Sequence, residues 1–203
     1  MLENAYIVDE NTMAFIPFFD SNGKVETYIL EVGSFKKCSM NPLELIDYNL
    51  RFFASSLKGA GEGTRHILGD VYKYPVILNL KRLLVWLPTM SQKNKECVWI
   101  ALNHIKTYKK QNHNNTEIHF TNDSSIILPI SFRSFEKRIH RAYELKFKLE
   151  FHAKFLQIPH SVKNNFFQCN IVKEADGMNY KISKKDKPNI MTWIVQSFKF
   201  SRF

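Results

Sequence analysis

The sequence predicts an α+β fold, mainly antiparallel sheet, with one mid-chain helix over about residues 41–58 and one long helix over about residues 134–155. Most of the chain consists of short segments rich in β-branched and aromatic residues, separated by turn residues. Two longer segments instead repeat apolar residues at helical spacing. The 203 residues are 44% hydrophobic and include 17 phenylalanines, so we expect one domain with an aromatic core, or one domain plus an appendage.

The first fifty residues predict strands and then a helix. Residues 5–8, 12–18 and 25–32 have strand composition, and the turn SNG at residues 21–23 joins the last two as a hairpin. Asn41, Pro42 and Glu44 form the sequence of a capping box with proline at the first helical position. Apolar residues then follow at helical spacing on one face, namely Leu43, Ile46, Leu50, Phe53 and Leu57.

Three glycines, at positions 59, 61 and 63, follow this predicted helix between Lys58 and Arg65. A phosphate-binding loop needs glycines that lead into a helix N-terminus, where free N–H groups face the anion. Here the glycines come after the helix, and Thr64 stands where a GxGxxG motif needs a glycine. We therefore expect Gly59 to end the helix. A flexible basic loop that touches a DNA backbone remains an alternative.

The middle of the chain predicts further strands, at residues 64–68, 76–80 and 83–88. Residues 97–110 begin apolar and end in lysines, which predicts one central strand emerging into solvent near Lys109 and Lys110. Residues 116–121 and 126–131 predict a hairpin, and Pro129 indicates an edge strand.

The helix predicted at residues 134–155 has three distinct faces. Ser134 is a suitable N-cap. The core stripe consists of Phe135, Ile139, Ala142, Leu149 and Ala153. A basic flank consists of Arg138, Arg141, Lys148 and His152, either as a solvated surface or as a polyanion contact. A second apolar strip, either covered by the chain's own tail or forming a subunit interface, consists of Phe147, Phe151 and Phe155.

Charge is distributed unevenly along the chain. Residues 1–50 hold three basic and eight acidic side chains, a net charge of −5, whereas residues 51–203 hold 26 basic and 11 acidic side chains, a net charge of +15. This asymmetry favours nucleic acid as the partner over a charge that only keeps the protein soluble, with an anionic membrane surface third. No apolar run is long enough to span a membrane, and three widely separated cysteines suit a reducing cytoplasm.

Motifs that carry chemistry are absent from the sequence. There is no HExxH, GxSxG or Walker A motif, and the seven histidines have no metal-ligand spacing. We therefore expect no enzyme, no metal site and no cofactor.

Three blocks resemble the ComK family of bacterial competence transcription factors. They are MNPLELIDYNLRFFASSLKGAGEGT at residues 40–64, CVWIALNHIKTYK at 97–109 and TEIHFTNDSSIILPISFRSFEKRIHRAYELKFK at 116–148. The resemblance implies a ComK-like domain over residues 1–156, and a divergent C-terminal extension over residues 157–203 that could pack on it. Two departures accompany it: Ala60 and Gly61 replace the basic residues usual in the family's glycine segment, and the tail does not match.

The resemblance also implies a function: a sequence-selective DNA-binding activator of DNA-uptake genes, in the bacterial cytoplasm and on the nucleoid. Its partners would be paired A/T-rich boxes of double-stranded DNA, read largely from the minor groove, a second copy as a dimer or as paired dimers, RNA polymerase and a protease adaptor. The alternative is a basic RNA-binding or protein-interaction module without transcriptional activity. From charge and position, the candidate DNA-binding residues are Lys58, Arg65, Lys109, Lys110, Arg138, Arg141 and Lys148.

Overall fold

A computed structural model of the chain describes residues 6–155, 169–173 and 180–184. Contacts divide the chain into two units, Met1–Leu156 and Gln157–Phe203. In the second unit, β10 (Cys169–Lys173) and β11 (Tyr180–Lys184) pair as an antiparallel hairpin. The first unit combines three helices with antiparallel sheets, which confirms the predicted α+β class.

A six-stranded antiparallel sheet is the centre of the first unit, in the order β3-β2-β1-β6-β5-β4. The predicted turn at residues 21–23 does join β1 to β2, because Asp20 accepts hydrogen bonds from the amides of Asn22 and Lys24 and Gly23 takes a positive φ. The strands are β1 (Thr12–Phe19), β2 (Val25–Glu31), β3 (Phe35–Cys38), β4 (Val76–Asn79), β5 (Leu84–Pro88) and β6 (Trp99–Ala101). Strand β3 was not predicted, and residues 6–8 do not form the predicted strand.

The single strand predicted at residues 97–110 is two strands in two sheets. A short 3₁₀ turn, η1 (Leu102–His104), separates β6 from β7 (Ile105–Lys110). His104 is buried there, with Nε2 2.7 Å from the carbonyl oxygen of Glu10 and Nδ1 3.0 Å from Oγ1 of Thr121. These distant contacts explain why local composition did not reveal the break.

Strand β7 belongs to a three-stranded antiparallel sheet, in the order β7-β8-β9, with β8 (Thr116–Phe120) and β9 (Ser125–Leu128). The predicted hairpin between the last two strands is confirmed. Strand β9 lies at the edge of this sheet, and Pro129, which has no N–H to donate, follows it directly.

The helix predicted over residues 41–58 begins as expected but ends early. In α1 (Pro42–Phe52), Asn41 and Glu44 form the complete capping box. The chain then turns at Ala54, which has a positive φ, and Ser56 caps a second helix, α2 (Leu57–Leu68), by accepting from the amide of Gly59. The strand predicted at residues 64–68 and the glycine loop are therefore both wrong, because these residues belong to α2.

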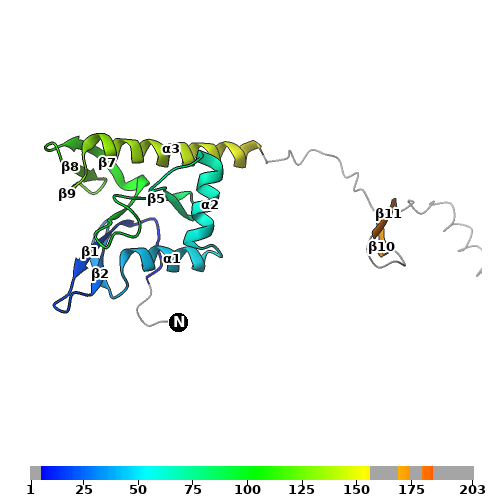
Figure 1. Ribbon diagram of the computed structural model, residues 1–203, viewed down its shortest axis with the longest axis horizontal. Coiled ribbons are helices and arrows are strands. Elements are labelled where there is room, and N and C mark those ends of the chain that lie inside the picture. The colour runs from blue at the N-terminus through cyan, green and yellow to red at the C-terminus, as the bar shows by residue number, and fades with distance from the viewer. Residues whose placement is uncertain (1–5, 156–168, 174–179, 185–203) are drawn as a thin grey trace, which may run out of the picture. The chain divides into compact units, whose positions relative to one another are not determined.

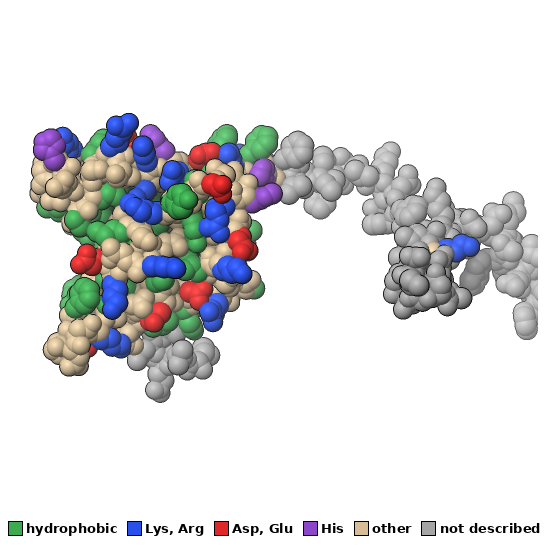
Figure 2. Space-filling model, viewed as in Figure 1, with side chains coloured by type: hydrophobic (Ala, Val, Ile, Leu, Met, Phe, Trp, Pro, Cys, Tyr) green, Lys and Arg blue, Asp and Glu red, His purple; other side chains and the backbone are tan. Residues whose placement is uncertain are grey.

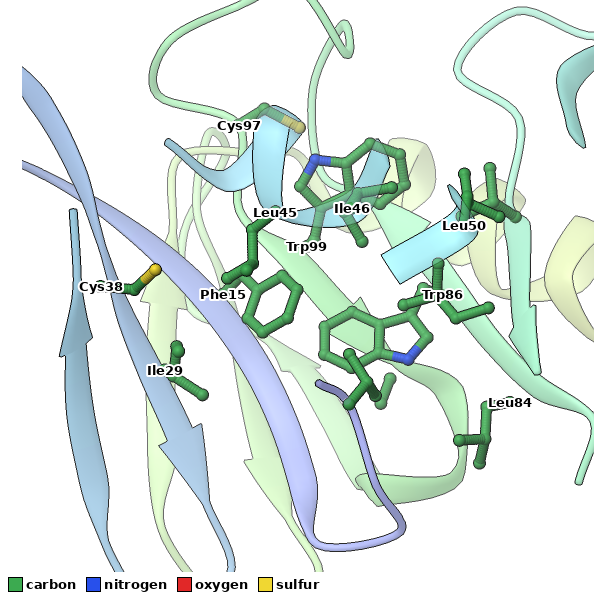
Figure 3. Close-up of a cluster of buried hydrophobic side chains, with 14 residues drawn as sticks. Phe15, Ile29, Cys38, Leu45, Ile46, Leu50, Leu84, Trp86, Cys97 and Trp99 are labelled. Atoms are coloured by element: carbon green, nitrogen blue, oxygen red, sulfur yellow. The ribbon is translucent and has the colours of Figure 1, made fainter. Parts of the chain in front are cut away.

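Both faces of the six-stranded sheet are covered at its centre, so the domain has three layers. Alternate strand residues point to opposite sides: Phe15 and Trp86 pack with α1 residues, whereas Ala14 and Val85 pack with α3 (Phe132–Phe155) and the small sheet. Figure 1 shows α1 and α3 on the two sides with strands between them. On the α1 side, the rings of Phe15 and Trp86 lie together, with centroids 4.5 Å apart (Figure 3).

Candidate nucleic-acid interface

The basic flank of α3 mostly binds backbone carbonyl oxygens of the protein itself. Arg138 donates to the carbonyl of Pro88 at 2.9 Å, Arg141 to that of Tyr72 at 3.1 Å and Lys148 to that of Ile67 at 3.2 Å. These bonds tie α3 to the end of β5, to the segment after α2 and to the last turn of α2. The sequence predicted this flank to be a solvated surface or a polyanion contact, and for the buried Arg138 both predictions are wrong.

Arg138 differs most from the prediction. Only 8% of the residue is exposed, and burial lowers the pKa of its guanidinium to about 10. A buried cation with a fixed carbonyl partner has no face left for a phosphate, so we leave Arg138 out of the proposed DNA surface. Arg141 is half-buried, and Lys148 also pairs with Glu144 at 2.7 Å, so both keep part of their surface in solvent.

The four other predicted residues lie apart from this flank. Lys58 is in the first turn of α2, exposed, and 4.0 Å from Glu62, a weak contact. Lys109 and Lys110 end β7 in the three-stranded sheet, where Lys109 pairs with Glu117 at 3.3 Å. Arg65 is in the last turn of α2, seven residues from Lys58 and about 10 Å further along the helix axis.

Arg65 opens onto a solvent-exposed hollow beside the segment that follows α2. The hollow has a volume of about 610 Å³. Three cations, Arg65, Lys73 and Lys93, and one acid, Asp70, line it, and within the described residues none of the three cations forms an ion pair. We call it the basic hollow; its lining consists of Arg65, Asp70, Val71, Tyr72, Lys73, Tyr74, Ser91, Gln92 and Lys93.

Gly61 allows the wall of this hollow to form. A Cβ atom at Gly61 would lie 2.3 Å from the hydroxyl oxygen of Tyr74, so only glycine lets that ring approach α2 so closely. The guanidinium of Arg65 then lies over the Tyr74 ring, 5.1 Å from its centroid. Thr64 donates to the carbonyl of Pro75 at 3.0 Å, and Gln92 donates to that of Tyr74 at 3.2 Å. Gly61 thus helps to position a basic surface from inside a helix.

Lysines continue beyond the basic hollow. A second hollow of about 430 Å³ shares Gln92 and Lys93 with it and adds Lys24 and Lys95, together with Glu44. Figure 2 shows Lys and Arg side chains spread over one face, from the level of α3 to that of α1, with several acids between them. Sequence reasoning missed Lys73, Lys93 and Lys95; their position in turn-rich segments without apolar periodicity was the available signal.

The second half of α3 leaves the core. Leu145 is its last fully buried residue, whereas Leu149 is half-buried and Ala153 is exposed, so the predicted core stripe is shorter than expected. Of the predicted apolar strip, Phe147 is 68% and Phe151 is 57% exposed. Phe155 ends the helix, and its side chain lies outside the described residues.

Neither a metal site nor a membrane span is found in the part of the chain that the structure describes. No group of three His, Cys, Asp or Glu residues there could hold a metal ion. None of the helices in those residues is long and apolar enough to cross a bilayer.

A basic α+β domain with cations gathered around open hollows is the kind of protein that binds polyanions. The sequence model of one family, described as ComK protein, matches residues 3–154. The chain is also 32% identical over 146 residues to the competence transcription factor of Bacillus subtilis (strain 168), which covers 72% of this chain and 76% of that protein. No solved structure matches the chain significantly. The chain belongs to the ComK family, as its sequence blocks suggested.

Proposed function

We propose that this protein is a DNA-binding transcription factor that activates genes for DNA uptake. The basic hollow is the observation that carries the binding part, since three cations that form no ion pair within the described residues face solvent there. Its relative in Bacillus subtilis is named as a competence transcription factor, which supports the regulatory part. From its membership of the ComK family, we further propose that the protein acts on the nucleoid in the cytoplasm, contacts RNA polymerase and has its level controlled through a protease adaptor.

The proposed targets are paired A/T-rich boxes, recognised largely from the minor groove. A-tracts narrow that groove and strengthen its negative potential, which attracts Arg and Lys side chains. The minor groove distinguishes A·T from G·C pairs and little else. The protein would therefore select A/T content and box spacing. Besides Arg65, the proposed contact surface includes the exposed candidates Lys58, Lys109 and Lys110 and the half-buried candidates Arg141 and Lys148.

We also propose that the protein binds DNA as a dimer through the second half of α3. Tyr143, Phe147 and Phe151 are four residues apart in turn, and each is more than half exposed. Three large apolar side chains on one helical stripe suit a self-complementary contact between two copies. Two-fold symmetry would match paired boxes.

Binding of the full chain to three nucleic acids tests the proposal. The probes are a duplex with two A/T-rich boxes, a G/C-rich duplex of equal length and a structured RNA of similar size. We expect the first to bind most tightly, and if about six phosphates are neutralised, log K should fall with log salt at a slope near −5. Equal affinity for both duplexes at moderate salt would contradict minor-groove selection. Tightest binding to the RNA would favour the alternative RNA-binding module.

A further inference from the structure

We infer that the basic hollow seats a phosphate group of the DNA backbone and so acts as a sequence-independent anchor. This inference rests on the proposed function and names the part of DNA that this surface contacts. The cations come from three segments of the chain: Arg65 from α2, Lys73 from the segment after it, and Lys93 from the connection between β5 and β6. Their convergence around one concavity, with a single acid among them, concentrates positive potential there.

The shape of the surface favours backbone over bases. Base edges lie at the floor of the grooves, so a protein reads them with elements that project into a groove. A concave surface receives what projects from the duplex, and that is the phosphate backbone. Contacts to phosphate fix the position of a protein on DNA and carry no direct sequence information.

The hollow is also held in place before any ligand arrives. Arg65 lies over the ring of Tyr74, and the backbone of residues 72–75 is bound from two sides, by Arg141 of α3 and by Thr64 of α2. Fewer side chains and loops must then be ordered on binding, which reduces the entropic penalty. Tyr72, which is 85% exposed, adds a phenol hydroxyl to the lining, a group that commonly donates to phosphate oxygens.

The Asp70→Asn variant tests the inference through an expected gain of affinity, which a misfolded protein would not show. Its carboxylate lies in the lining and opposes a phosphate there. Asp70→Asn removes that repulsion, so we expect binding of both the A/T-rich and the G/C-rich duplex to tighten by about threefold at low salt. A damaged protein would not bind more tightly.

Lys93→Ala tests the attractive side of the same surface. Removing a charged donor to phosphate should lower the affinity for both duplexes by about tenfold at low salt. The ratio of the affinity for the A/T-rich duplex to that for the G/C-rich duplex should stay unchanged. The salt slope should fall by about one. The matched control is Lys81→Ala, an exposed lysine in the turn between β4 and β5, outside the lining. It removes the same charge, and we expect it to change binding by less than about twofold.

The experiment is a salt titration of the full-length proteins by fluorescence anisotropy on both duplexes. Equal losses for Lys93→Ala and Lys81→Ala would overturn the inference, because only net charge would then matter. If Lys93→Ala lowers the ratio of the affinity for the A/T-rich duplex to that for the G/C-rich duplex, the inference is also overturned, because residues of the hollow would then contact bases. Unchanged binding by Asp70→Asn would also overturn it. These three results leave the proposed function intact, whereas wild-type protein that binds neither duplex overturns both.

Discussion

Gly61→Ala and Gly63→Ala should have opposite effects, although both replace a glycine inside α2 with a residue of higher helix propensity. That replacement alone stabilises a helix by about 0.5–1 kcal/mol. A Cβ at Gly63 would meet nothing within 4 Å, so the full gain should appear. At Gly61 the added atom would lie 2.3 Å from Oη and 2.4 Å from Cζ of Tyr74, so the ring must shift. Overpacking of this kind costs about 1–3 kcal/mol.

The difference between the two variants isolates that overpacking cost, because both carry the same propensity gain. We expect the free energy of unfolding of Gly61→Ala to be about 1–3 kcal/mol lower than that of Gly63→Ala, measured by urea denaturation of the full chain. In thermal melts, each 1 kcal/mol of lost stability lowers Tm by about 2–4 °C for a chain of this size. Adding Tyr74→Ala to each variant should remove most of the difference. Equal stability of the two single variants would refute the proposed packing of Tyr74 on α2.

Three other expectations concern stability and assembly. Arg138→Ala should lower the free energy of unfolding by about 1.5–3 kcal/mol, since it removes a charged donor to the carbonyl of Pro88. In the same urea titrations, Arg133→Ala, at an exposed position on the first turn of α3, should change that free energy by less than about 0.5 kcal/mol. Equal effects of the two substitutions would contradict the buried role of Arg138. Phe147→Glu should shift the protein to monomer in sedimentation, while Asn103→Glu, an exposed change of equal charge, should not; a monomeric wild type or an unchanged oligomer would exclude the α3 interface. Hydrogen bonds from Lys36 and Ser34 hold the pKa of Glu31 at about 2, against an ordinary value of 4.5. Because the pKa is lowered in the folded state, this stabilisation is complete above about pH 4.5 and is lost as the pH falls through 2. In denaturation at a series of pH values, the difference in free energy of unfolding between wild type and Glu31→Gln should therefore shrink over that range. A difference that grows on acidification would contradict the assignment.

Local signals in the sequence were enough to place the start of α1, the β1–β2 and β8–β9 hairpins, and the long helix, although α3 begins at Phe132 and Ser134 lies inside it instead of capping it. The capping box of Asn41 and Glu44 is formed by residues three apart, so nothing distant is needed to interpret it. The end of α1 was missed because the three glycines suggested a terminus, although Ser56 was available as a second N-cap. Glycine is poor in isolated helices, and here close packing against Tyr74 outweighs that preference.

The surface was harder to predict than the fold, because a charge on a helix flank does not reveal its partner. Arg138 binds a carbonyl 50 residues away, and Lys148 binds one 81 residues away. Helical spacing placed both on one flank but could not distinguish a solvent-facing cation from one that bonds another segment. The basic hollow depends on Lys73 and Lys93, which come together only when the segment after α2 and the β5–β6 connection fold.

The three glycines of α2 also determine how this helix opens. Relative to alanine they lower its intrinsic stability by about 1.5–3 kcal/mol, so α2 depends on its neighbours for order. Backbone amides of such a segment exchange with solvent through local opening, at a lower free energy than those of α1. A phosphate seated against Arg65 would oppose that opening, by about 2.7 kcal/mol at a ligand concentration one hundred times Kd. Deuterium uptake by the amides of α2 would then slow about a hundredfold. The exchange rate of this helix would therefore measure occupancy of the hollow without a probe attached to the protein.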